Sequence, residues 1–272
     1  MNREYWSSFF IAIGTISSVV TLVSFVFQLR NPSNCTIFIY ASGVILFSYI
    51  FAELQTYRKT KLTIGISNNL TIKVESGDLF SFTKDGNYVV IPMNEYFDTI
   101  VDDKIINAGS IHGQFINRYY PGDAHVKLHE EIEGYLNEKG IKGIECARPN
   151  GNGYIIKYPL GTCVTINKDG TYFVLVSLTH FDDNDKAYVE LSEFGRCISL
   201  LCHHLAKETG THPVYMPLMG MGLSRLNQSG QFILKYTLDS IIGVKDLALL
   251  GGLSVILYPP VARTINLNEI KY

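Results

Sequence analysis

The chain has 272 residues, which allows one anchor and one ordinary domain but not two large domains. Its formal net charge of −2 argues against nucleic acid as a main partner, because phosphate binding requires a basic surface. The five cysteines form no CxxC pair and no zinc-type ligand cluster is present in the sequence. We therefore expect free thiols in a reducing compartment, and neither a metal nor a cofactor.

Two uncharged runs open the chain. Residues 6–29 are 24 residues without a charge, and residues 35–52 are another 18. A helix rises about 1.5 Å per residue and the hydrocarbon core is about 30 Å thick, so the first run is long enough to span and the second is close to the minimum. The first run is too long for a signal peptide and no cleavage site follows it. We expect a transmembrane hairpin in residues 1–60, with helices at about 6–29 and 35–53.

The charges around these runs indicate their orientation. Residues 30–34 have the residue types of a turn, and Arg30 is their one charged residue. Three basic residues, Arg58, Lys59 and Lys61, follow the second run. The positive-inside rule then places both chain ends and the following domain in the cytosol.

Residues 61–272 have the composition of a soluble domain. In chain order, the patterns predict strands over 62–74, 88–92, 172–178, 214–217 and 254–258, and helices over 123–140, 187–209 and 229–242. Strands that alternate with helical stretches favour an α/β fold around a central sheet.

Two glycine-bearing segments each follow a predicted strand. We name them the first glycine segment (107–115) and the second glycine segment (218–223). A strand, a glycine-rich loop and a helix N-terminus together offer free N–H groups and a helix dipole to phosphate. The alternative for each glycine segment is a tight turn that binds no ligand. The Gly77-Asp78 pair also has two interpretations. The carboxylate of Asp78 either caps the next helix or turn, or accepts a hydrogen bond from the base or sugar of a ligand.

The histidines are scattered along the chain. His203 and His204 are adjacent in a predicted helix and point to different faces, as ordinary helix residues do. His112 lies inside the first glycine segment, where it either contacts a ligand or satisfies backbone groups of the loop. The sequence contains no GxSxG, HExxH or Walker A motif, so we predict no catalytic residue.

Taken in order, these segments resemble a macro domain. Residues 74–79 (Val-Glu-Ser-Gly-Asp-Leu) are similar to the family's Gly-Asp-Ile signature, and residues 89–94 stand where it carries Ile-Val-Asn-Ala-Ala-Asn. Residues 218–223 look like its second phosphate loop, and the resemblance covers roughly Leu62 to Pro260. With the hairpin and residues 110–115, the chain resembles the membrane effectors of bacterial type II Thoeris anti-phage defence.

In that family a TIR-domain enzyme senses infection and makes histidine-ADP-ribose. The macro domain binds this messenger, the effector assembles, and membrane disruption kills the infected cell by abortive infection. The resemblance therefore implies a macro-domain-like α/β fold, with a mixed central sheet flanked by helices, behind a two-helix transmembrane hairpin. It also implies a multi-pass protein of the bacterial inner membrane, with lipids, the messenger and further copies of the chain as partners. The TIR-domain enzyme would be a partner through its product.

The resemblance also implies ligand-binding residues. Asp78 would accept a hydrogen bond from the adenine amino group with the Leu79 backbone beside it, and Asn94 would lie near the distal ribose. The diphosphate would be held by the residues of both glycine segments: Ser110, Ile111, His112, Gly113, Gln114, Phe115, Met219, Gly220, Met221, Gly222 and Leu223.

One departure from the family favours binding over catalysis. The hydrolases carry Asn-Ala-Ala-Asn where this chain has Pro92-Met93-Asn94-Glu95. A membrane-anchored ADP-ribosyl hydrolase is the alternative, and a structural anchor whose domain binds another protein is a third possibility.

Overall fold

The computed structural model describes residues 3–26, 42–52, 59–148, 153–182, 184, 186–222 and 225–272. The chain divides into two compact units, Met1–Lys59 and Thr60–Tyr272. The second unit contains the sheet, both hydrophobic cores and the site described below.

The first unit contains helix α1 (Arg3–Val26) and a helix over 42–52. In α1 the hydroxyls of Ser18 and Thr21 donate to the carbonyls of Gly14 and Ser17, one turn earlier. None of the helices in the described part of the chain combines the length and the apolar character needed to cross a membrane. The predicted transmembrane hairpin is therefore not supported by these helices, and its predicted turn at 30–34 lies outside the described residues.

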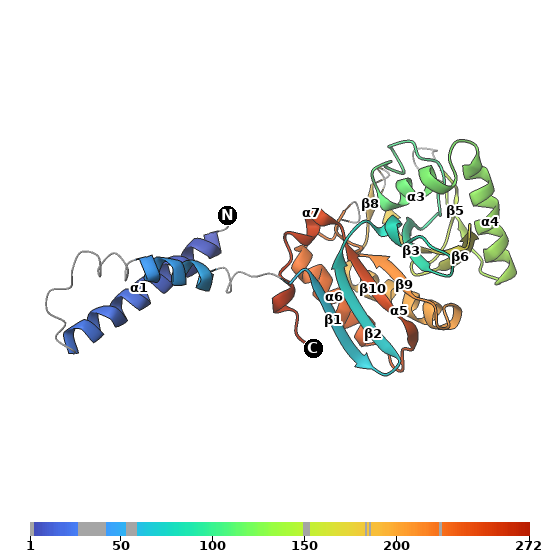
Figure 1. Cartoon of the computed structure of the whole chain (residues 1–272). Coiled ribbons are helices and arrows are strands. Elements are labelled where there is room, and N and C mark those ends of the chain that lie inside the picture. Colours follow the sequence, from blue (N-terminus) through green and yellow to red (C-terminus); the bar gives the residue numbers. More distant parts are fainter. Residues whose placement is uncertain are drawn as a thin grey trace. The chain divides into compact units, whose positions relative to one another are not determined.

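An eight-stranded mixed sheet organises the described residues of the second unit (Figure 1). Its order is β1-β2-β10-β9-β3-β7-β6, and β8 pairs with β7. The five central strands run parallel, whereas β1, β6 and β8 are antiparallel to their neighbours. The strands are β1 (Lys61–Ser67), β2 (Leu70–Ser76), β3 (Tyr88–Asn94), β6 (Cys163–Lys168), β7 (Thr171–Phe181), β8 (Ala187–Tyr188), β9 (Val214–Pro217) and β10 (Leu249–Leu257).

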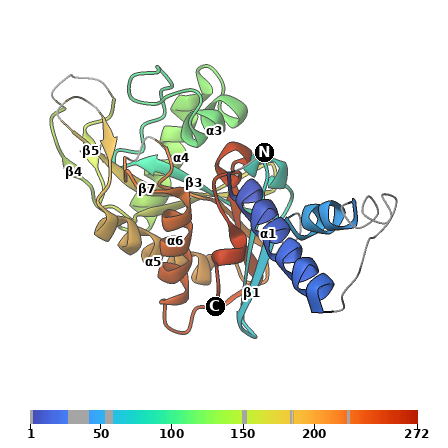
Figure 2. The same ribbon diagram turned by 90° about the vertical axis from the view of Figure 1, so that its left-hand side faces the viewer.

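Helices cover both faces of the sheet (Figure 2). Side chains alternate between the faces of each strand, so Val90 joins one core while Val89 and Ile91 join the other. The first core is closed by α5 (Leu191–Glu208) and α6 (Gly230–Ile242), and the second by α3 (Ile111–Tyr119) and α4 (Ala124–Glu138). The smaller elements are η1 (Leu79–Phe82), β4 (Ile144–Glu145), β5 (Ile156–Lys157), α7 (Pro259–Ala262) and η2 (Leu267–Glu269).

The predicted α/β class with a mixed sheet is confirmed, and three local predictions are wrong. Residues 62–74 are a hairpin of β1 and β2 rather than one strand, because the chain turns between Ser67 and Leu70. Strand β6 was not predicted. Residues 111–115 belong to helix α3 rather than to a loop, because Ser110 caps the helix and Phe115 and Ile116 bury its apolar face.

Candidate ligand-binding site

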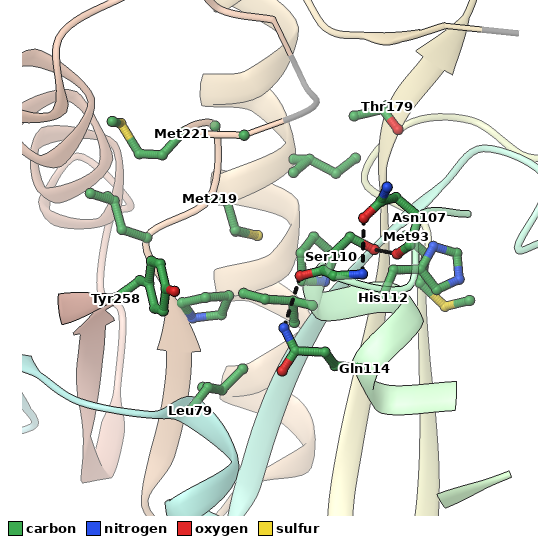
Figure 3. A pocket seen from close by; sticks show the side chains of 18 of the residues that line it. Leu79, Met93, Asn107, Ser110, His112, Gln114, Thr179, Met219, Met221 and Tyr258 are labelled. Carbon is green, nitrogen blue, oxygen red and sulfur yellow. Dashed lines mark hydrogen bonds between the residues drawn. The ribbon is translucent and has the colours of Figure 1, made fainter. Parts of the chain in front are cut away.

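The carboxyl ends of β2, β3, β7, β9 and β10 surround a cavity of about 880 Å³, here called the strand-end cavity. Small-molecule sites typically enclose about 300–1,000 Å³, and open α/β sheets bind ligands at this edge. Figure 3 shows Met219 and Met221 on one side of the cavity, with Asn107 and Ser110 on the other.

Most of the predicted site residues line this cavity although they are distant in sequence. Those that line it are Asp78, Leu79, Asn94, Ser110, Ile111, His112, Gln114, Met219, Gly220, Met221 and Gly222. Two of the predicted residues do not. Phe115 is fully buried against Phe173, and Gly113 packs so closely on the Asn107 backbone that a β-carbon would lie 2.3 Å from its carbonyl oxygen. Leu223 lies outside the described residues.

The turn after β2 presents Asp78 to the cavity. Its Oδ1 accepts a hydrogen bond from the Phe80 N–H at 3.1 Å, so the carboxylate caps helix η1. Its Oδ2 lies 3.7 Å from Nη1 of Arg118. The capping alternative for Asp78 is therefore observed, and the partner of its second carboxylate oxygen among the described residues is the distant Arg118.

The N-terminus of α3 forms one side of the cavity. The Ser110 hydroxyl accepts from the Gly113 N–H at 3.0 Å and donates to the Asn107 carbonyl at 2.7 Å. This cap leaves the N–H groups of Ile111 and His112, in the first helical turn, without an acceptor among the described residues. Free N–H groups at the positive end of a helix dipole are suited to hold an anion.

His112 satisfies a backbone group of the same loop. Its Nε2 lies 2.9 Å from the carbonyl oxygen of Asp98, which can only accept, so Nε2 carries the proton. Burial lowers the pKa of His112 to about 4. The ring is therefore neutral at physiological pH, and it contributes shape and an Nδ1 acceptor rather than charge.

The second glycine segment forms the opposite side. Gly220 has φ +87°, a conformation that favours glycine, and a β-carbon there would lie 2.7 Å from Leu226. The N–H groups from Met219 to Gly222 have no acceptor within the part of the chain that is described. Helix α6 begins at Gly230, one residue after the predicted start at residue 229, so its N-terminus does not directly follow this segment.

A strained turn fixes Asn94 at the end of β3. The Asn94 Oδ1 accepts from the N–H groups of Tyr96 at 3.0 Å and Asp98 at 3.3 Å. Between them, Phe97 is buried with φ +49°, which is rare for a residue with a side chain. Because Oδ1 is engaged, Nδ2 is the amide group of Asn94 that remains for a ligand, and the Asp98 carboxylate competes for it.

A buried ion pair supports this turn. Arg148 Nη1 lies 2.8 Å from Asp98 Oδ2, and both side chains are 2% exposed. The Tyr154 N–H also donates to Asp98 Oδ1, and the Arg148 guanidinium stacks on the rings of Tyr96 and Phe181. Both charges are buried and hydrogen-bonded to each other, so this pair holds residues 94–98 in place.

Glu95 points away from the cavity into a bridge with His180 and Glu193. The two imidazole nitrogens lie 2.8 Å from Glu95 Oε2 and 3.0 Å from Glu193 Oε1. The hydrogen bond to Glu95, together with the Glu193 carboxylate, raises the pKa of His180 to about 9 despite partial burial. This His180 bridge ties the ends of β3 and β7 to the first turn of α5.

Several residues that line the cavity were not predicted as site residues, and four of them are Arg118, Thr179, Phe181 and Tyr258. Figure 3 shows Leu79 and Tyr258 towards one end of the cavity and Thr179 towards the other. Two of the four had a sequence signal. Thr179 directly follows the predicted strand 172–178, and Tyr258 is the last residue of the predicted strand 254–258, whereas Arg118 belongs to the unpredicted helix α3.

The described residues show no metal-type cluster and no disulfide. They contain no group of three metal-ligating side chains, and their four cysteines are free. Burial raises the pKa of Cys197 and Cys202 to about 12, so these thiols are protonated and unreactive at neutral pH.

Known proteins resemble this chain in sequence. The sequence profile of the family described as Thoeris protein ThsA, Macro domain, matches residues 72–248. Thoeris protein ThsA of Bacillus amyloliquefaciens (strain Y2) is 28% identical over 270 residues, which cover 99% of this chain and 80% of that protein.

Solved structures of low similarity were also found. The Oceanobacillus iheyensis macrodomain with ADP has a TM-score of 0.47 and 13% identity, over 75% of this chain and 92% of that one. The same macrodomain with MES bound has a TM-score of 0.49 and 13% identity, over 76% and 93%.

The two glycines of the second segment should respond differently to alanine. Gly220→Ala forces a side chain into φ +87° and should lower the free energy of unfolding by about 1–2 kcal/mol. Gly222→Ala meets open space and should change it by less than about 0.5 kcal/mol. Urea unfolding followed by circular dichroism measures both, and equal effects would contradict the conformational assignment of Gly220.

The His180 bridge should make stability depend on pH. The folded pKa of about 9 lies above the unfolded value of about 6.5, so the bridge stabilises fully below pH 6.5 and its contribution is lost as pH rises towards 9. The stability difference between wild type and His180→Gln should therefore shrink between pH 6 and pH 9.5. His203→Gln, on the exposed face of α5, is the control. A difference that stays constant with pH would show that the bridge does not titrate.

Proposed function

The chain belongs to the Thoeris ThsA macro-domain family, and on that basis we propose that it binds an ADP-ribose-derived signalling nucleotide as a receptor in anti-phage defence. The strand-end cavity is the observation that carries this proposal. It brings the Gly-Asp turn and both glycine segments to one space of suitable size.

The nucleotide would lie along the length of the cavity. Its base would occupy the end near Leu79, where Asp78 Oδ2 can accept from an amino group and the exposed ring of Tyr258 offers a stacking face. The distal ribose would reach Asn94 Nδ2 near Thr179. Leu79 is buried and apolar, which suits the face of a base.

The diphosphate would be bound mainly by backbone. The N–H groups of Ile111 and His112 approach from one side, and those of Met219 to Gly222 from the other. The lining described for the cavity contains no lysine and only one arginine, Arg118. Preorganised N–H groups and the α3 dipole would therefore supply most of the stabilisation of the negative charge.

Two observations support binding rather than hydrolysis. Glu95, next to the segment that resembles the hydrolase pattern, is held by His180 and does not line the cavity. Asp78 is the carboxylate that lines the cavity, and in the proposed pose it contacts the base, far from the distal ribose. The alternative, an ADP-ribosyl hydrolase, would be revealed by release of ADP-ribose from a modified protein.

The remaining steps of the proposal come from the family resemblance. The messenger, histidine-ADP-ribose, would be the product of a TIR-domain enzyme, and its binding would favour an assembled form of the protein over a resting one. Assembly would then disrupt the bacterial inner membrane and cause abortive infection. Membrane attachment stays a prediction from the two uncharged runs of the sequence.

A thermal-shift panel on the full chain tests the proposal. ADP-ribose and histidine-ADP-ribose should raise the melting temperature, because a ligand that binds only the folded state stabilises it. NAD in the same panel tests whether the cavity accepts a nicotinamide in place of the free ribose end. No shift with any ADP-ribose compound would contradict the proposal and favour a structural anchor.

Asp78→Asn should weaken binding of ADP-ribose about tenfold. Asparagine keeps an oxygen to cap η1 but turns its amide N–H groups towards the base, and loss of such a pairing costs about 1–3 kcal/mol. The matched control is Asp123→Ala, which removes a carboxylate that precedes α4 and makes no capping hydrogen bond. Isothermal titration calorimetry should show that the control binds ADP-ribose with the affinity of wild type. If Asp78→Asn also binds with the affinity of wild type, the base does not lie at the Asp78 end of the cavity.

Reporters fused after Tyr272 test the predicted orientation. A fluorescent protein that folds in the cytosol should be active in membrane fractions, and an alkaline phosphatase that requires the periplasm should be inactive. The reverse pattern would contradict a cytosolic receptor, and recovery of both fusions in the soluble fraction would contradict the membrane step alone.

A further inference from the structure

Arg118 lies at the base end of the cavity, over an aromatic ring. It lies in the last turn of α3, and its guanidinium carbon is 4.3 Å from the centroid of the Phe80 ring. Phe80 is 7% exposed and belongs to η1, so the ring is a firm support. Stacking on the ring leaves the N–H donors in the guanidinium plane, directed to the sides.

Those donors face two polar groups of the cavity. Nη1 lies 3.7 Å from Asp78 Oδ2, and Nη2 donates to Gln114 Oε1 at 3.4 Å. Gln114 in turn donates to the Gly109 carbonyl at 2.9 Å. Arg118 therefore connects the turn after β2 with the loop that precedes α3.

The pair of Asp78 and Arg118 is loose enough to admit a ligand. Charge-assisted hydrogen bonds are about 2.7–2.9 Å long, so 3.7 Å is a contact without a direct bond. The side chains are 59% and 45% exposed, and ion pairs of this kind contribute little to stability. A base could therefore approach both groups without breaking a strong interaction.

Asp78 and Arg118 also carry the formal charges of the cavity lining. Among the residues that line the cavity, Asp78 is the one acidic side chain and Arg118 the one permanently cationic side chain, and they stand side by side. A carboxylate accepts hydrogen bonds and a guanidinium only donates them. Together they offer an acceptor next to a donor.

We propose that Arg118 determines base specificity together with Asp78, by donating to a ring nitrogen beside the amino group that Asp78 accepts from. Adenine presents an amino N–H next to an unprotonated ring nitrogen. Hypoxanthine presents a carbonyl next to a ring N–H, so in the same pose it sets acceptor against acceptor and donor against donor. This inference rests on the proposed function, because it assigns the base of that nucleotide.

The test compares two ligands that differ only in the base. Calorimetry on the full chain measures affinity for ADP-ribose and for inosine diphosphate ribose, which carries hypoxanthine. Wild type should prefer ADP-ribose by about tenfold or more, since each well-made pairing of this kind discriminates by roughly 5- to 150-fold. Arg118→Met should reduce that preference to about threefold or less.

Two further variants separate base readout from charge. Arg118→Lys keeps the positive charge but lacks the planar fork, so it should retain affinity for the diphosphate better than Arg118→Met while losing preference for adenine. Lys139→Met is the matched control, because Lys139 is also 45% exposed, also lies over an aromatic ring and also pairs loosely with a carboxylate, but it does not line the cavity. Its preference should equal that of wild type.

The outcomes are distinguishable. Equal losses of affinity for both ligands in Arg118→Met, with the preference unchanged, would show that Arg118 acts only through its charge and would overturn the inference alone. A wild type that binds both ligands equally would also overturn it, with the proposed function intact. Binding of neither ligand by wild type would overturn the proposed function and the inference with it.

Discussion

The parallel alignment of the five central strands is the constraint on which the site depends. Backbone hydrogen bonds hold β2, β10, β9, β3 and β7 in one direction, so their carboxyl ends reach the same edge of the sheet. Each end delivers a segment that lines the cavity, although these segments are spread over more than half of the chain. Helices on both faces bury the strands, which makes this edge the place where loops can form a pocket.

Side-chain hydrogen bonds hold the strand ends and turns next to the cavity. The Asn94 side chain accepts hydrogen bonds from the backbone N–H groups of Tyr96 and Asp98, and the buried pair of Asp98 and Arg148 stabilises the same turn. The His180 bridge fixes the neighbouring strand end. These side chains act by positioning. Such preorganisation lowers the entropy that ligand binding must overcome, and it is consistent with a receptor that recognises one nucleotide.

The lining of the cavity is mainly apolar, with charge concentrated at one end. Free N–H groups of the two glycine segments provide polar contacts without side-chain charge, and His112 is neutral because it is buried. Asp78 and Arg118 lie together at the Leu79 end. A site of this kind distinguishes ligands by hydrogen-bond pattern and shape. These features suit the proposed binding of a nucleotide.

The sequence by itself determined the fold class and the segments that carry the site, because strand periodicity, glycine segments and the Gly-Asp turn are local signals. It could not determine which of those residues face a ligand. Gly113 and Phe115 look like loop residues, yet Ser110 starts a helix that turns them into the protein interior. Arg118, Thr179 and Tyr258 carry no motif, and they reach the cavity only because α3, β7 and β10 end there. Their role depends on packing between distant segments, which tertiary structure alone decides.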